Sequence, residues 1–247
     1  MNSVVKAILD RSTLKVSLIR ISNATEDTFD VSIESRVEKT GFVGATISEM
    51  EVDMVFRGVC FGKLQLPEVQ TRSSGADVNF YNQRVKILDM NAFKAFVEAL
   101  MLEDSLVLSL KQGHCSIRAL GLTSNVVYNK DVQLRGMKGP RVALAETTAT
   151  TNTMKVSNPS PLEIDHGISM FDIVNEKGEV AAELKGRLCI VRGDFDSQMD
   201  ISFNKGASVE GRAQLVGRGT SCQNWTNDTL KFIHTEVDVN PVFSSFL

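Results

Sequence analysis

The sequence is poor in the residues that carry most metal and redox chemistry, with four cysteines and three histidines among 247 residues. The cysteines are Cys60, Cys115, Cys189 and Cys222. They lie far apart without a C-x-x-C pair, which excludes the usual spacings of zinc and dithiol sites. We expect four free, mostly buried thiols. The alternative is one bridge within each half of the chain, Cys60 to Cys115 and Cys189 to Cys222.

The short motifs of common catalytic sites are also missing. The sequence contains no G-x-S-x-G, no H-E-x-x-H and no phosphate-binding loop. Its histidines, His114, His166 and His234, form no local metal pair, so a solvent-facing or capping role is favoured for each. Proton transfer in a pocket stays open, because histidine titrates near neutral pH. We therefore expect neither a metal nor a cofactor.

Charge and hydropathy exclude two further classes of partner. Charged residues make up 23% of the chain and the net charge is -3, so no basic bias points to nucleic acid. No apolar run approaches the ~18 to 20 residues that cross a bilayer, so no integral membrane segment is expected. The first ten residues lack a signal-type apolar core. We expect a soluble chain, with a cytoplasmic location favoured, and a removed leader or anchor as the alternative.

What the sequence does contain is a phrase that occurs twice. Ile21-Ser22-Asn23-Ala24-Thr25 returns 135 residues later as Val156-Ser157-Asn158-Pro159-Ser160. Each copy lies between strand-like segments, and a repeat this long indicates domain duplication rather than a solenoid. Two modules of about 120 residues suit the chain length. The composition shifts between about 121 and 150, and we predict domains at 1–125 and 126–247.

Alternation of apolar and polar residues predicts many short antiparallel strands in both modules, separated by glycines. The predicted fold class is therefore mainly β, with two tandem sandwiches. In the first module, residues 91–103 show helical spacing instead, with Asn91 placed to cap the helix. In the second, Asn175-Glu176-Lys177-Gly178 predicts a hairpin turn, and residues 226–234 suggest a short helix before a strand resumes.

A strand that ends in Asn-Pro-Ser, followed by a short strand and a glycine, resembles the late-embryogenesis-abundant type 2 domain, also called the water-stress and hypersensitive-response (WHy) domain. Residues 158–167 are similar to a fungal, usually membrane-anchored branch, and the likeness extends to residues 61–67 and 83–89. The resemblance implies an immunoglobulin-like β-sandwich with one added helix, and no general catalytic residues. Ala24 stands where the family has proline, which we expect to be conformationally mild, and the family's N-terminal anchor is missing. We expect Asn23 and Asn158 to be structural, each holding a turn through hydrogen bonds to nearby backbone.

A ligand site is expected in the groove between the modules or under the helix, because pockets favour domain junctions. The candidate wall residues are Trp225, Tyr81, Tyr128 and His166, and no catalytic residue can be named. The leading hypothesis is cofactor-free binding of an apolar small molecule or lipid. The alternatives are a cofactor-independent cyclase, pericyclase or isomerase of fungal secondary metabolism, and a scaffolding or adhesion module. A homo-oligomer is compatible with each.

Overall fold

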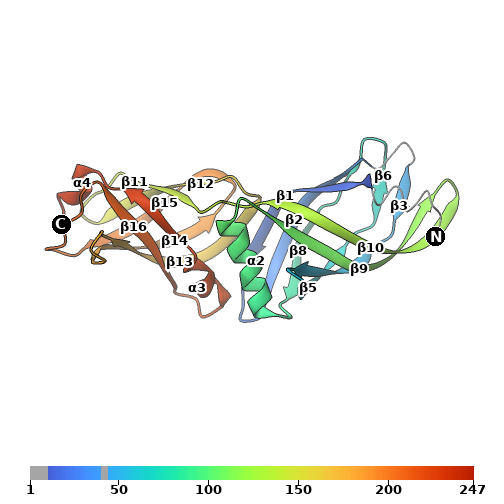
Figure 1. The fold of residues 1–247 in the computed structure, drawn as a ribbon, viewed down its shortest axis with the longest axis horizontal. Coiled ribbons are helices and arrows are strands. Elements are labelled where there is room, and N and C mark those ends of the chain that lie inside the picture. The colour runs from blue at the N-terminus through green and yellow to red at the C-terminus, as the bar shows by residue number, and fades with distance from the viewer. Residues whose placement is uncertain (1–10, 40–43) are drawn as a thin grey trace. The chain divides into compact units, whose positions relative to one another are not determined.

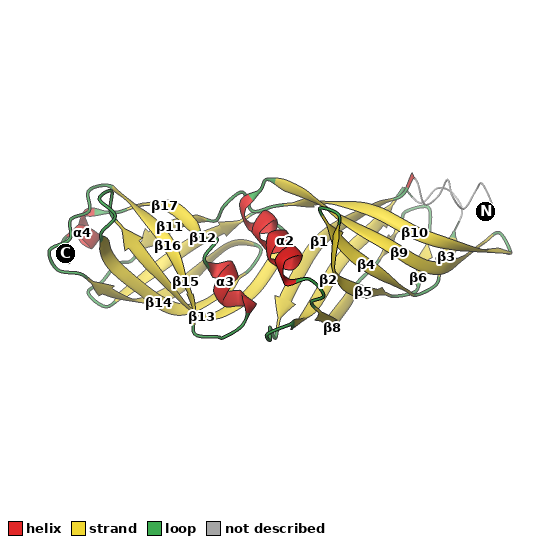
Figure 2. Cartoon of the chain, turned by 60° about the horizontal axis from the view of Figure 1, so that its bottom comes forward, coloured by secondary structure: helices red, strands yellow, loops and turns green. Residues whose placement is uncertain are grey.

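The computed structural model describes residues 11–39 and 44–247. The chain divides into two compact units. The first contains the described residues up to Asn23, then Asp27–Phe96 and Ser105–Arg135. The second contains Ala24–Glu26, Val97–Asp104 and Gly136–Leu247. Both units are built almost wholly from antiparallel strands (Figures 1 and 2), so the predicted mainly β, sandwich-like fold class is confirmed.

Two sheets face each other in the first unit. In one, β2 (Thr28–Glu38) pairs with β1 (Thr13–Ser22), β7 (Ala76–Asp77) and β8 (Phe80–Lys86). The other has the order β5 (Val59–Leu66), β4 (Met50–Phe56), β9 (Ser105–Ala119), β3 (Ala45–Ile47) and β6 (Val69–Thr71), and β10 (Leu122–Arg135) also pairs with β9. Strand β5 lies next to β8, and β1 lies next to β10. The two sheets therefore approach each other along both edges and enclose a core.

The second unit is one antiparallel sheet that folds back on itself. Its order is β11 (Arg141–Ala145), β12 (Thr151–Asn158), β15 (Gly193–Phe203), β14 (Val180–Ile190), β13 (Leu162–Val174), β16 (Arg212–Thr220) and β17 (His234–Asp238). The last strand lies beside β11. Helix α3 (Trp225–Leu230) packs on β16 and β13, and a short helix, α4 (Pro241–Ser244), follows β17.

The predicted helix is α2 (Met90–Leu102), and its first turn differs from the prediction. Asp89, not Asn91, caps it: the Asp89 carboxylate accepts from the backbone N–H of Ala92 at 2.9 Å. Asn91 lies inside the helix, because the chain turns helical one residue earlier than the apolar spacing suggests. Phe93 and Phe96 on the apolar face are buried, and Phe93 stacks on Phe29 of β2 at 4.9 Å between ring centroids.

The structure also bears on the predicted hairpin turn, the predicted short helix and the predicted domain boundary. The turn at residues 175–178 is confirmed: Gly178 has a φ of 80° and its N–H donates to the Asn175 carbonyl. The short helix is α3, which ends at Leu230 before β17 resumes at His234. The predicted boundary at residue 125 falls inside β10, which pairs with β9 as far as Arg135.

All four cysteines are free, so the bridged alternative is wrong, and only Cys115 is buried.

The two copies of the repeated phrase have different conformations. Asn158 is buried, and its amide donates to the carbonyls of Leu162 at 2.7 Å and Val191 at 3.0 Å. Asn23 is exposed, has a φ of 49°, and donates to the Asp30 carboxylate at 2.8 Å instead of to the backbone. The turn-holding role is therefore confirmed for Asn158, whereas Asn23 binds a side chain.

Alanine at position 24 is compatible with the left-handed conformation of Asn23, whereas proline there is not. A proline restricts the residue before it to the extended region, and Asn23 is left-handed. We now expect Ala24→Pro to lower the free energy of unfolding by about 2 kcal/mol, a larger effect than the sequence alone suggests. The matched variant Pro159→Ala follows an Asn158 without a positive φ and should cost less than about 1 kcal/mol. Urea unfolding measures both, and an Ala24→Pro cost no larger than that of Pro159→Ala would contradict this account.

Candidate ligand site

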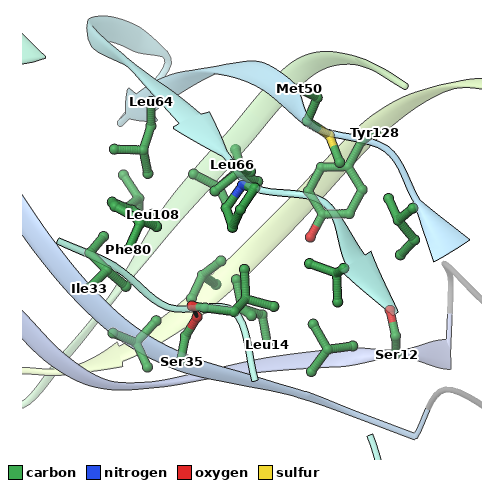
Figure 3. Close-up of a pocket in the computed structure, with 18 of the residues that line it drawn as sticks. Ser12, Leu14, Ile33, Ser35, Met50, Leu64, Leu66, Phe80, Leu108 and Tyr128 are labelled. Atoms are coloured by element: carbon green, nitrogen blue, oxygen red, sulfur yellow. Dashed lines mark hydrogen bonds between the residues drawn. The ribbon is translucent and has the colours of Figure 1, made fainter. Parts of the chain in front are cut away.

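A cavity of about 70 Å³ lies between the two sheets of the first unit (Figure 3). Most of its lining is aliphatic. Its wall is formed by Ser12, Leu14, Val16, Ile19, Ile33, Ser35, Val37, Ile47, Met50, Leu64, Leu66, Pro67, Val69, Val78, Phe80, Leu108, Leu110, Tyr128, Val132 and Leu134. None of these described residues carries a charge. Water has few partners in such a place, so the cavity is expected to be dry.

The distribution of phenylalanines explains where the cavity forms. Phe29, Phe56 and Phe61 pack against the α2 phenylalanines at one end of the sandwich. At the opposite end of β4, Met50 faces the cavity. There the inward positions hold mostly valine, leucine and isoleucine, which occupy less volume than aromatic rings. The distance between the two sheets does not shrink where the inward side chains are smaller, because it is set along the whole sandwich by the backbones. A void therefore remains.

Tyr128 supplies the one phenol in the wall. It lies on β10 opposite Gly113 of β9, and its hydroxyl points among the apolar lining side chains (Figure 3). A Cβ on Gly113 would lie 2.7 Å from the Met50 sulfur and 3.1 Å from the Tyr128 Cβ. A side chain at 113 would therefore displace Met50 and press on Tyr128.

The Tyr128 side chain is 9% exposed, and among the described residues its hydroxyl has no hydrogen-bond partner. Burial raises the pKa of Tyr128 to about 12, with a smaller contribution from Cys115. The group is thus a neutral phenol at physiological pH, able to donate one hydrogen bond and unable to act as a base. Ser35, also in the wall, is already satisfied, since its hydroxyl donates to the Val78 carbonyl at 2.7 Å.

The structure separates the four residues predicted from the sequence. Tyr128 lines the cavity within the first unit, whereas Tyr81 on β8 is 58% exposed. Trp225 and His166 belong to the second unit, where both are buried near α3. Sequence reasoning missed Gly113 and the aliphatic wall. The signal was present as alternation in β9 and β10, but alternation identifies core positions without saying whether they fill the space.

His166 differs most from expectation, since it is 1% exposed rather than solvent-facing. The β13–β14 register skips it between Asp165 and Gly167, and Gly167 has a φ of 67°. This is a β-bulge with glycine in the left-handed position, and such bulges re-aim a side chain. The imidazole Nε2 lies 3.5 Å from the Thr229 hydroxyl of α3.

The protonation of His166 follows from these partners. The Thr229 hydroxyl donates to the Thr226 carbonyl, so its oxygen accepts from Nε2–H. Nδ1 is buried and has no partner in the part of the chain that the structure describes. Burial lowers the pKa of His166 to about 4, against the opposing effects of the Asp165 carboxylate and the Ile164 backbone. His166 is therefore a neutral core group at physiological pH.

Across 11–39 and 44–247, histidine, cysteine, aspartate and glutamate side chains nowhere gather in a group that could hold a metal ion. In the same ranges, no helix has the length and apolarity needed to span a bilayer.

One family model matches part of the chain. The model described as "Protein of unknown function (DUF3712)" matches residues 60–173. That segment includes the second copy of the repeated phrase and excludes the first. It covers less than half of the 247-residue chain. No curated protein matches.

Three solved structures to which this chain is similar are distant in sequence. A chaperone–tip adhesin complex of CFA/I fimbriae has 9% identity and a TM-score of 0.23, with 93% of this chain and 99% of that chain covered. The CsuC–CsuE chaperone–tip adhesion subunit complex of Acinetobacter baumannii has 9% identity and a TM-score of 0.21, with coverage of 92% and 97%. The calcium-binding domains CBD12 of CALX1.2 have 14% identity and a TM-score of 0.21, with coverage of 82% and 79%. At TM-scores this low, these likenesses carry no argument about function.

Proposed function

We propose that the first unit binds a slender apolar molecule, or the end of a lipid chain, in the cavity between its two sheets. The observation that carries the proposal is the continuous aliphatic wall around an unfilled space of about 70 Å³. An unfilled apolar cavity costs stability because its lining loses packing partners. A ligand that restores those contacts would offset this cost.

The size of the cavity limits what enters it. A cavity of about 150 Å³ holds benzene, so a space of about 70 Å³ holds about three non-hydrogen atoms on the same scale. A whole lipid does not fit. The cavity is not fully enclosed, so the terminal atoms of an unbranched chain enter it while the rest of the molecule lies at its open side. Binding is also favoured over the alternative of a cyclase, because a cyclase must enclose a flexible substrate in its reactive shape, and this cavity is too small.

Binding of n-pentane provides the direct test. Pentane at ten times its dissociation constant should raise the free energy of unfolding by about 1.4 kcal/mol, measured by urea unfolding in sealed cells. Leu108→Phe places a larger side chain in the cavity and should abolish this increase. The neighbouring Val107 is 44% exposed, so Val107→Phe is the matched control and should retain it.

The proposal fails if pentane does not stabilise the wild-type protein, or if it stabilises Leu108→Phe equally. Cooperative unfolding of Leu108→Phe without pentane confirms that the variant folds. Native mass spectrometry of the freshly purified protein then shows whether a small molecule is retained and gives its mass.

A further inference from the structure

We propose that the ligand carries a neutral hydrogen-bond acceptor beside its aliphatic chain, such as a ketone, aldehyde or ester carbonyl, and that the Tyr128 hydroxyl donates to it. This inference rests on the proposed function and specifies its ligand class. It follows from Tyr128, whose hydroxyl has no hydrogen-bond partner among the residues that the structure describes.

A tyrosine hydroxyl that faces an apolar cavity without a hydrogen-bond partner among the described residues requires an explanation. Buried tyrosine O–H groups usually find a partner, and leaving one unpaired costs stability. Phenylalanine would fill the same space without that cost. The chain instead places tyrosine at 128 and glycine opposite it at 113, where a Cβ would be 2.8 Å from the Val52 Cγ1 atom. The arrangement directs a donor into the cavity (Figure 3).

The charge of the ligand follows from the rest of the wall. No lysine, arginine or histidine occurs among the described residues around the cavity. A carboxylate placed there would be buried without a counter-charge, at a cost one neutral donor does not offset. A pure hydrocarbon would leave the Tyr128 hydroxyl unpaired. A neutral acceptor satisfies both conditions.

Three probes of equal size separate these cases: 2-pentanone, its isostere 2-methyl-1-pentene, and butanoate. Their dissociation constants are measured by NMR titration of wild-type protein, Tyr128→Phe and Tyr81→Phe. One hydrogen bond is worth about tenfold in affinity. We therefore expect Tyr128→Phe to weaken 2-pentanone binding about tenfold and to change alkene binding by less than about twofold. Tyr81 is exposed, and Tyr81→Phe should change neither. Butanoate should not bind measurably.

A second measurement is independent of affinity. The carbonyl stretch of bound 2-pentanone should lie at lower wavenumber than in hexane, and Tyr128→Phe should reverse this shift. Ligand-free Tyr128→Phe should unfold at a higher urea concentration than wild type, since it lacks the unpaired hydroxyl, so misfolding is readily recognised.

The outcomes distinguish the two proposals. If neither the ketone nor the alkene binds wild-type protein, the proposed function fails. If both bind and Tyr128→Phe weakens them equally, or if butanoate binds as tightly as the ketone, apolar binding stands and the inference about the acceptor is overturned.

Discussion

Replacing Asn158 with alanine is expected to lower the free energy of unfolding by about 4 kcal/mol. Its amide joins the start of β13 to the segment after β14 through the carbonyls of Leu162 and Val191. Its side-chain oxygen accepts from the Ser160 N–H at 3.0 Å and from the Ser160 hydroxyl at 2.6 Å. All of these groups are at or near the core, so water cannot replace the lost partner.

The first copy of the phrase supplies the control. Asn23 is exposed and makes one hydrogen bond, to an Asp30 carboxylate that also pairs with Arg84. Asn23→Ala should therefore cost no more than about 1 kcal/mol. Urea unfolding of both variants gives the comparison. Equal costs for the two asparagines would show that the repeat, and not burial, sets their contribution.

Asn23 and Asn158 also show how much of the structure can be predicted from the sequence alone. The repeated phrase correctly indicates two sandwich-like units, because strand alternation and turn residues are local signals. It does not predict that one asparagine is buried and the other left-handed, since this depends on the segments packed against each strand end. Leu162 and Val191 are 4 and 33 residues from Asn158, and only the first of these contacts is local.

The candidate site was harder to predict than the fold. Tyr128 was expected near a domain junction because glycines and polar residues surround it in the sequence. It instead continues β10, whose partner β9 was already recognisable as a strand. The cavity itself depends on the summed side-chain volumes of two facing sheets, and a sequence pattern states only which residues face inward. The burial of His166 does have a sequence signal, because a glycine directly after it permits the left-handed turn of a bulge.

His166 should make the protein unstable to mild acid. Its pKa is about 4 in the folded protein, against 6.5 for an unperturbed histidine side chain. The folded-state pKa is depressed, so between these values the unfolded chain binds more protons, and stability falls as the pH falls. From about pH 7 to about pH 5 this single group should remove about 2 kcal/mol of the free energy of unfolding, rising to about 3 kcal/mol below pH 4.

Carboxylates also titrate in this range, so the contribution of His166 is isolated by difference. Urea unfolding of wild type and His166→Gln at a series of pH values should give a shallower decline for the variant. His234 is exposed, and His234→Gln should keep the wild-type slope. His166→Leu serves as a second variant if glutamine destabilises the bulge, because leucine has no lone pair to leave unpaired beneath α3. An unchanged slope in both His166 variants would mean that the imidazole is protonated, or solvated, in the folded protein. Its burial beside Thr229 would then not determine its charge.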